Sequence, residues 1–206
     1  MRPLFLALAL AGIATAQHDH AAPTAVGPTD VAETFTVEGF RVDVGELPPG
    51  SAVGRAGLRY GDGGYVRVVH GKPYARGRVV FGGVVALNTV WAAGAHQQTE
   101  LYTTVPLQIG GTRVAPGAYG LFVTPRVEGW TLHVNRALGM HLADEYDPAL
   151  DVATVSVRSE VLDPTSADPS RLPVEGLTWS FAGDGSALRL AWDRVAASFP
   201  IARASE

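Results

Sequence analysis

The residues best suited to bind a ligand lie in one irregular stretch of the chain, residues 70–98. It holds Lys72, the only lysine of the protein, together with two arginines and a tryptophan, and several glycines and a proline interrupt it. Ammonium and guanidinium groups bind anionic or polyhydroxylated molecules, and an indole ring offers a stacking surface. The stretch therefore predicts a binding site for a small molecule, a glycan or a component of the cell envelope. Its predicted contacts are Lys72, Arg76, Arg78, Trp91, His96 and Gln97.

The same residues have a purely structural interpretation. The cations could pair with loop carboxylates and backbone carbonyls while Trp91 packs into the core. The protein would then be a structural or protein-interaction domain without a ligand.

Histidines give a third interpretation, a site for a divalent metal. Three imidazoles can hold zinc or copper without any cysteine, but here they are far apart in sequence, so only the fold could bring them together. The candidate ligands are His70, His96, His133 and His141. Such a site would make the chain a metal-binding protein or a metal-dependent hydrolase.

No complete catalytic motif occurs in the sequence. It contains no G-x-S-x-G, no H-E-x-x-H and no phosphate-binding glycine loop. Two carboxylates could act as an acid and base on a sugar if they lay about 5 to 9 Å apart across a cleft. The carboxylates available for this are Glu100, Asp144, Glu145, Asp147 and Asp151. Whether the protein is an enzyme stays open at this point.

Short alternating segments make up most of the rest of the chain. In Thr99–Val105 and Trp130–Arg136 every second residue would face a core, and Gly110–Gly111 predicts a hairpin turn. A glycine-rich passage, for which no strand is predicted, lies between Pro49 and Tyr65. Residues 152–161 predict another strand, and residues 137–144 one helical turn beside the sheet. Eight to ten short, mostly antiparallel strands and little helix predict an all-β fold, a single β-sandwich or jelly-roll-like domain.

The first residues have the pattern of a signal peptide. Arg2 precedes an apolar run, and Ala14-Thr15-Ala16 is a small-x-small cleavage site, so residues 1–16 are predicted to be removed after Ala16. Residues 17–33 predict a flexible lead-in, and 34–206 a single β domain. The mature protein is expected to be exported, periplasmic or secreted, without a membrane span.

Composition narrows the possible partners and cofactors. The chain has no cysteine, which excludes disulfides and thiolate metal sites. Its formal net charge is -4, and this mildly acidic balance argues against nucleic acid as a partner. The sequence predicts no organic cofactor.

Five blocks, in this order and at these intervals, resemble the bacterial exported family known as domain of unknown function 2911. The resemblance covers about Tyr65 to Ile201 and implies one β-sandwich-like domain behind a signal peptide, with no assigned activity. The blocks are KPYARGRVVFGG, VWAAGAHQQTEL, LQIGGTRVAPGAYGLFVTP, WTLHVNR and ALRLAWDRVAASFPI.

Two blocks depart from the usual pattern of that family. The first has Lys72 where an arginine is usual, which keeps the charge but loses the bidentate guanidinium. The second has Ala92, His96 and Gln97 where an arginine, an amide or carboxylate, and a glutamate are usual. The resemblance thus implies that the second block has lost a cation and a carboxylate.

Overall fold

A computed structural model describes residues 31–38 and 50–205. The predicted signal peptide, its cleavage site and nearly all of the lead-in lie outside these residues. Within the described ranges no helix has the length and apolar character that crossing a bilayer requires.

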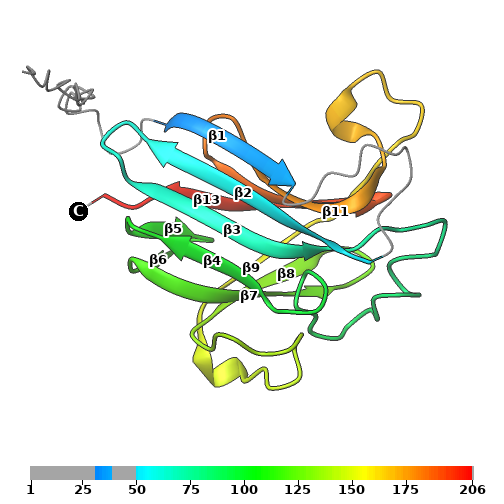
Figure 1. The fold of residues 1–206 in the computed structure, drawn as a ribbon, viewed down its shortest axis with the longest axis horizontal. Coiled ribbons are helices and arrows are strands. Elements are labelled where there is room, and N and C mark those ends of the chain that lie inside the picture. The colour runs from blue at the N-terminus through cyan, green and yellow to red at the C-terminus, as the bar shows by residue number, and fades with distance from the viewer. Residues whose placement is uncertain (1–30, 39–49, 206) are drawn as a thin grey trace, which may run out of the picture.

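The described chain forms two antiparallel sheets packed face to face (Figure 1), which confirms the predicted all-β fold. The seven-stranded sheet has the order β1-β2-β3-β4-β7-β8-β9, and the six-stranded sheet the order β11-β12-β13-β5-β6, with β10 on β13. The strands are β1 (Val31–Glu38), β2 (Ala52–Tyr60), β3 (Tyr65–Lys72), β4 (Thr99–Thr103), β5 (Leu107–Ile109), β6 (Thr112–Val114), β7 (Gly117–Pro125), β8 (Trp130–Asn135), β9 (Asp151–Val157), β10 (Glu160–Val161), β11 (Val174–Phe181), β12 (Ala187–Asp193) and β13 (Val195–Arg203).

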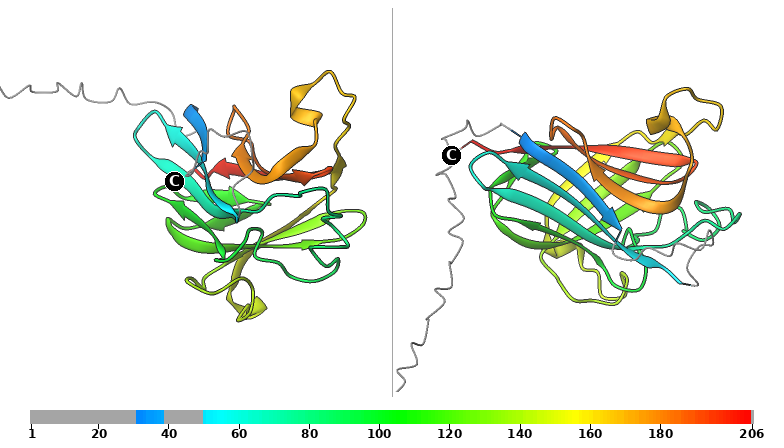
Figure 2. Two further views of the ribbon diagram at one scale, coloured as in Figure 1. Left: turned by 45° about the vertical axis from the view of Figure 1, so that its right-hand side comes forward. Right: turned by 45° about the horizontal axis from the view of Figure 1, so that its top comes forward.

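Alternation along the strands builds the core between the sheets. On β4, Thr99, Leu101 and Thr103 are buried while the residues between them are exposed. The largest enclosed side chains come from both sheets and include Trp130 of β8 and Trp179 of β11. Burial of such side chains is the main source of stability for a cysteine-free domain of this size. In Figure 2 the strands β11–β13 lie against β1–β3, and β11 packs on β2 and β3.

The glycine-rich passage between Pro49 and Tyr65, for which no strand was predicted, is occupied mostly by β2. Gly54 pairs with His70 on β3, and a Cβ at Gly54 would lie 2.3 Å from the His70 Nε2. The glycine thus makes room for an imidazole between the sheets. Glycine weakens the usual sequence pattern of a strand, so a strand that contains it for this reason is hard to recognise from the sequence.

Two further local predictions are corrected. The predicted strand over 152–161 is divided into β9 and β10, which belong to different sheets. The chain crosses between the sheets there, so one continuous ladder is impossible. The residues 137–144 make turns rather than a helical turn, and the short helices are 3-10 turns at Pro148–Leu150 and Pro169–Arg171.

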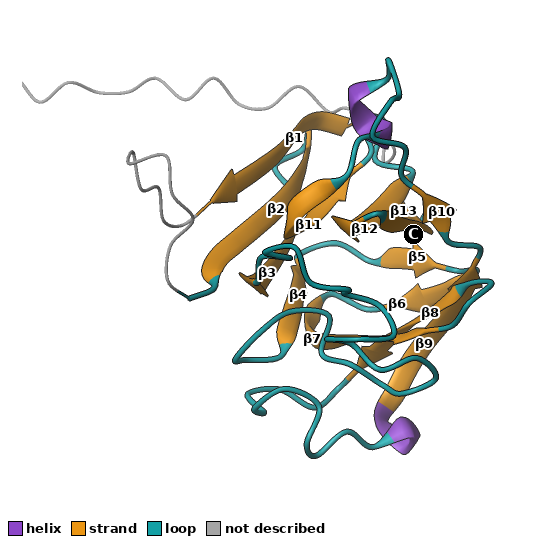
Figure 3. Ribbon diagram, turned by 90° about the vertical axis from the view of Figure 1, so that its right-hand side faces the viewer, coloured by secondary structure: helices purple, strands orange, loops and turns teal. Residues whose placement is uncertain are grey.

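The segment between β3 and β4, residues 73–98, closes one end of the sandwich. Figure 3 looks onto this end, where the connecting loops gather. Tyr74 bridges Gly176 of the six-stranded sheet, and Trp91 bridges Val123 of the seven-stranded sheet. We call this segment the insert. Because it is bonded to both sheets, its position is fixed by strands distant in sequence.

Candidate functional site

The cations predicted to bind a ligand, Lys72 of β3 and two arginines of the insert, have intramolecular partners. The Arg78 guanidinium donates to the carbonyls of Tyr74 at 2.6 Å and Ala75 at 3.0 Å. Arg76 donates to the Gly50 carbonyl at 3.1 Å and lies over the Tyr74 ring. Lys72 is 9% exposed and points between the sheets, where its Cε would meet a Cβ at Gly176. These three side chains therefore hold the insert and the sandwich end together.

Trp91 joins an aromatic cluster at the mouth of the core. Its ring stacks on Trp192 with centroids 5.9 Å apart and meets Phe81 edge-on at 6.2 Å. Its Nε1 donates to the Gly94 carbonyl at 3.2 Å. Such aromatic pairs contribute about 0.5–1.5 kcal/mol beyond their buried area. In this structure Trp91 anchors the insert to the core.

A cavity of about 330 Å³ lies on the outer face of the seven-stranded sheet, below the end of the insert. Val53, Val69 and Gly71 form its floor, since outward-facing residues alternate along β2 and β3. The insert residues Ala95 to Gln98 form one wall, and Glu100 of β4 closes a side. All lining residues are Ser51, Ala52, Val53, Val69, His70, Gly71, Ala95, His96, Gln97, Gln98 and Glu100.

The cavity contains only part of the sequence-predicted contact set. His96 and Gln97 line it, whereas Lys72, Arg76, Arg78 and Trp91 do not. Its floor and Glu100 are absent from the predicted set. The alternation along β3 would have excluded Lys72 from the predicted set, because it places Lys72 on the same inner face as buried Val66 and Val68.

Glycines let the wall approach the floor closely. A Cβ at Gly71 would lie 2.0 Å from the Ala95 carbonyl oxygen, and one at Gly94 2.7 Å from the Thr99 hydroxyl oxygen. The Ala93 carbonyl accepts hydrogen bonds from Thr99 Oγ1 and from Trp179 Nε1, each at 3.0 Å. The wall is thus bonded to β4 beside it and to β11 of the opposite sheet.

Gln98 connects the wall to the segment that follows β8. Its Nε2 donates to the Ala137 carbonyl at 2.8 Å, and its Oε1 accepts from the Met140 N–H at 2.9 Å. The side chain crosses Gly120, where a Cβ would lie 2.0 Å from Nε2. A buried amide satisfied at both ends fixes the wall in one position.

Several residues of the insert have strained backbone. Arg76, Asn88, Ala93 and His96 have φ between 52° and 67°, a region that disfavours residues with a Cβ. Such conformations cost on the order of 1 kcal/mol or more each, and proteins tend to retain them at functional sites. Ala93 and His96 stand at or beside the cavity wall.

His70 is enclosed on the inner face of β3, opposite Gly54. Burial lowers its pKa from the ordinary 6.5 to about 4, the hydrogen bond with the Gly71 carbonyl opposes this, and the Lys72 charge lowers it further. Because a carbonyl only accepts, His70 Nδ1 carries the proton in that 3.0 Å bond. The imidazole is therefore neutral at pH 7.

This depressed pKa predicts a loss of stability in acid. The His70 imidazole takes up a proton near pH 6.5 in the unfolded chain but only near pH 4 in the folded protein. The free energy of unfolding should therefore fall by about 3 kcal/mol as pH falls from 6.5 towards 4. Urea unfolding at pH 7 and pH 4 should show that His70→Gln loses less stability than the wild type over this interval. The exposed His141→Gln should behave as the wild type. Equal pH dependence in all three proteins would contradict the assignment.

The histidines do not converge into a metal site in the part of the chain that the structure describes. No group of three His, Asp or Glu side chains there could hold a metal ion. His133 instead bonds Asp151, Tyr146 and Thr124, and exposed His141 pairs with Asp144. His70 and His96 both line the cavity, but the His70 side chain points into the core between the sheets.

A buried polar network surrounds His133 on the outer face of β8. The Asp151 carboxylate accepts from Tyr146 at 2.7 Å and from Asn135 at 2.8 Å, and lies 3.0 Å from His133 Nδ1. Burial and then the hydrogen bond and charge of Asp151 raise the pKa of Tyr146. The phenol therefore stays protonated and donates. The network fastens the segment after β8 to the sheet.

Comparison with known proteins places the chain in a family. Residues 58–201 match the family described as protein of unknown function (DUF2911). The match spans most of the chain and includes β3, the insert, β4 and all later strands, with β13 covered as far as Ile201. No curated protein and no solved structure matches. The chain belongs to the DUF2911 family.

Proposed function

We propose that this protein is a non-enzymatic binding module that takes a small molecule, or one unit of a glycan or envelope component, into the cavity below the insert. One observation carries the proposal. His96, Gln97 and Glu100 line a largely apolar cavity, and among residues 50–205 none of their side chains has a hydrogen bond or ion pair. A few convergent polar groups around an apolar pocket are typical of ligand sites.

The size and construction of the cavity support this. A volume of about 330 Å³ falls within the range of natural ligand pockets. Its wall is held by Gln98, by the Ala93 carbonyl and by close contact at Gly71, so the site exists before a ligand binds. A preformed site avoids an ordering cost on binding.

In this proposal the predicted contacts divide into two groups. His96 and Gln97 contact the ligand, and Lys72, Arg76, Arg78 and Trp91 keep the insert in place. A divalent metal is not required. The signal-peptide pattern that ends at Ala16 supports export, so the ligand would be met in the periplasm or outside the cell.

A bulky side chain on the floor tests the site. With cyclohexanol as a neutral probe that fits the cavity, amide NMR shifts should cluster at Val53, Val69 and His96. Val53→Trp should weaken binding at least tenfold by filling the space above the floor. Val161→Trp, at an exposed valine of β10, is the matched control and should bind as the wild type. Shifts elsewhere, or none, would contradict the proposal.

A further inference from the structure

The cavity contains one charged side chain that nothing else in the described structure neutralises. Glu100 is the only Asp, Glu, Lys or Arg among the lining residues. It pairs in register with Val69 on β3 and with Gly120 on β7, so ladders on both sides fix its backbone. Its carboxylate makes no ion pair or hydrogen bond with residues 50–205.

The surroundings of Glu100 favour a cation with an apolar body. Val53 and Val69 offer methyl groups on the floor, and Gly120 places no side chain beside the carboxylate. His96 and Gln97 supply polar groups from the wall. Glu100 itself is exposed, so its attraction for a cation is the modest one of a solvated carboxylate, and contact with the valines must add to it.

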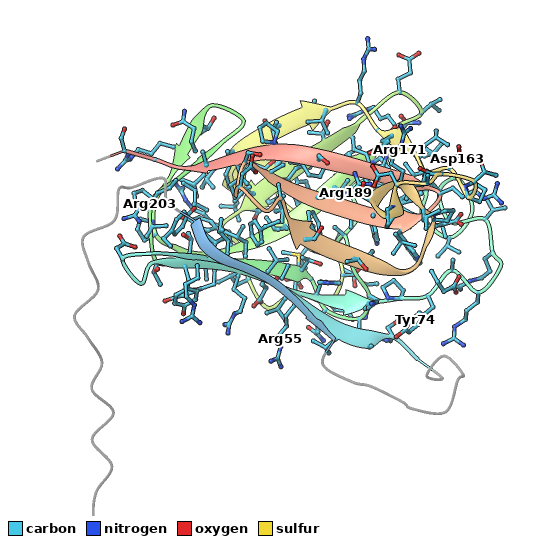
Figure 4. The ribbon with its side chains drawn as sticks, turned by 90° about the horizontal axis from the view of Figure 1, so that it is seen from above. Arg55, Tyr74, Asp163, Arg171, Arg189 and Arg203 are labelled. Carbon is cyan, nitrogen blue, oxygen red and sulfur yellow. The ribbon has the colours of Figure 1, made fainter. Side chains whose placement is uncertain are left out.

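Two arginines on this face lie outside the cavity. Arg67 of β3 is exposed and pairs with Tyr102, two residues from Glu100. Arg55 of β2 pairs with Val69, which places Arg55 and Glu100 on opposite sides of the same floor residue. Figure 4 shows Arg55 projecting from β2 away from the sandwich. Neither arginine is a lining residue, and among residues 50–205 neither forms an ion pair with Glu100. Glu100 is therefore available to a ligand.

We propose that the ligand is an amine, whose ammonium group binds Glu100 while its hydrocarbon part rests on Val53 and Val69. This inference rests on the proposed binding function and specifies its ligand class. The sequence, with its lysine and arginines, predicted an anionic or polyhydroxylated ligand. The proposed ligand is instead a cation, because those lysine and arginine side chains contact other parts of the protein.

Three probes of one shape and different charge test the inference: cyclohexylamine, cyclohexanol and cyclohexanecarboxylate, titrated at pH 7 and followed by amide NMR shifts at the cavity. Cyclohexylamine should bind most tightly and the carboxylate most weakly. Glu100→Gln should weaken amine binding roughly fivefold and leave cyclohexanol unchanged. Arg55→Gln, the matched removal of a charge on the same face, should not weaken the amine.

The outcomes separate the two proposals. If none of the probes shifts the cavity residues, the binding function itself is wrong. If cyclohexanol binds as well as the amine, or if Glu100→Gln has no effect on the amine, the binding function stands and the amine is wrong. Tighter binding of the carboxylate, lost in Arg55→Gln, would assign the site to anions.

Discussion

Gly71→Ala should destabilise the protein by about 2–3 kcal/mol and abolish binding at the cavity. The added Cβ would stand 2.0 Å from the Ala95 carbonyl oxygen and 2.8 Å from its carbonyl carbon and amide nitrogen. All three are backbone atoms, so no rotamer change relieves the overlap. The wall must move away from β3, and we expect this to lower the free energy of unfolding by as much as overpacking a protein core does. Thermal or urea unfolding and cyclohexanol titration would measure both effects.

Gly183→Ala is the control for this substitution. A Cβ at Gly183 would meet nothing within 4 Å. That variant should be neutral or slightly more stable, because alanine restricts the unfolded chain. A Gly71→Ala protein with wild-type stability and an unchanged cavity would show that the wall does not press on the sheet.

Asp151→Ala should cost about 3 kcal/mol or more. The carboxylate accepts from Tyr146 and Asn135 and pairs with His133 in a site where the His133 and Asp151 side chains are 15% and 11% exposed. Its removal takes one acceptor from each of these three side chains, and a hydrogen bond to a charged group contributes about 1.5–3 kcal/mol. Urea unfolding at pH 7 would measure the loss.

Asp144→Ala offers a matched comparison. His141 and Asp144 are 2.9 Å apart, slightly closer than the buried pair, but their side chains are 64% and 65% exposed. Water solvates both side chains there, so the variant should change stability by less than about 0.5 kcal/mol. Equal losses in the two variants would mean that the network around Asp151 adds nothing to a simple ion pair.

Alternation and turn residues were sufficient to predict the architecture. Thr99–Val105 and Trp130–Arg136 face the core as their patterns indicate, and Gly110 and Gly111 make the turn between β5 and β6 with positive φ. These signals are local, so a sequence displays them directly. The strand β2 was missed because Gly54 and Gly57 resemble a connection, although Gly54 serves a contact with His70.

The cavity could not be read from the sequence, because it depends on where the insert returns to the sheet. The contact of Gly71 with Ala95 joins residues that no local pattern pairs. Charge alone suggested that Lys72 faces a ligand. Extending the alternation of Val66 and Val68 along the strand would have placed Lys72 on the inner face instead. Val53 had no predicted role and Glu100 only that of a possible acid or base on a sugar, and the fold brings both to one cavity.

The two attachments of the insert have a consequence for the order of folding. Tyr74 and Trp91 contact Gly176 and Trp192, partners that lie far later in the sequence. Contacts of such separation form late, since the intervening chain must first be organised. A nascent chain that has emerged only as far as β9 can hold the larger sheet and the bridge from Trp91 to Val123, but it lacks the anchors of the insert on β11 and β12. The capacity to bind should therefore appear last, as the C-terminal strands arrive.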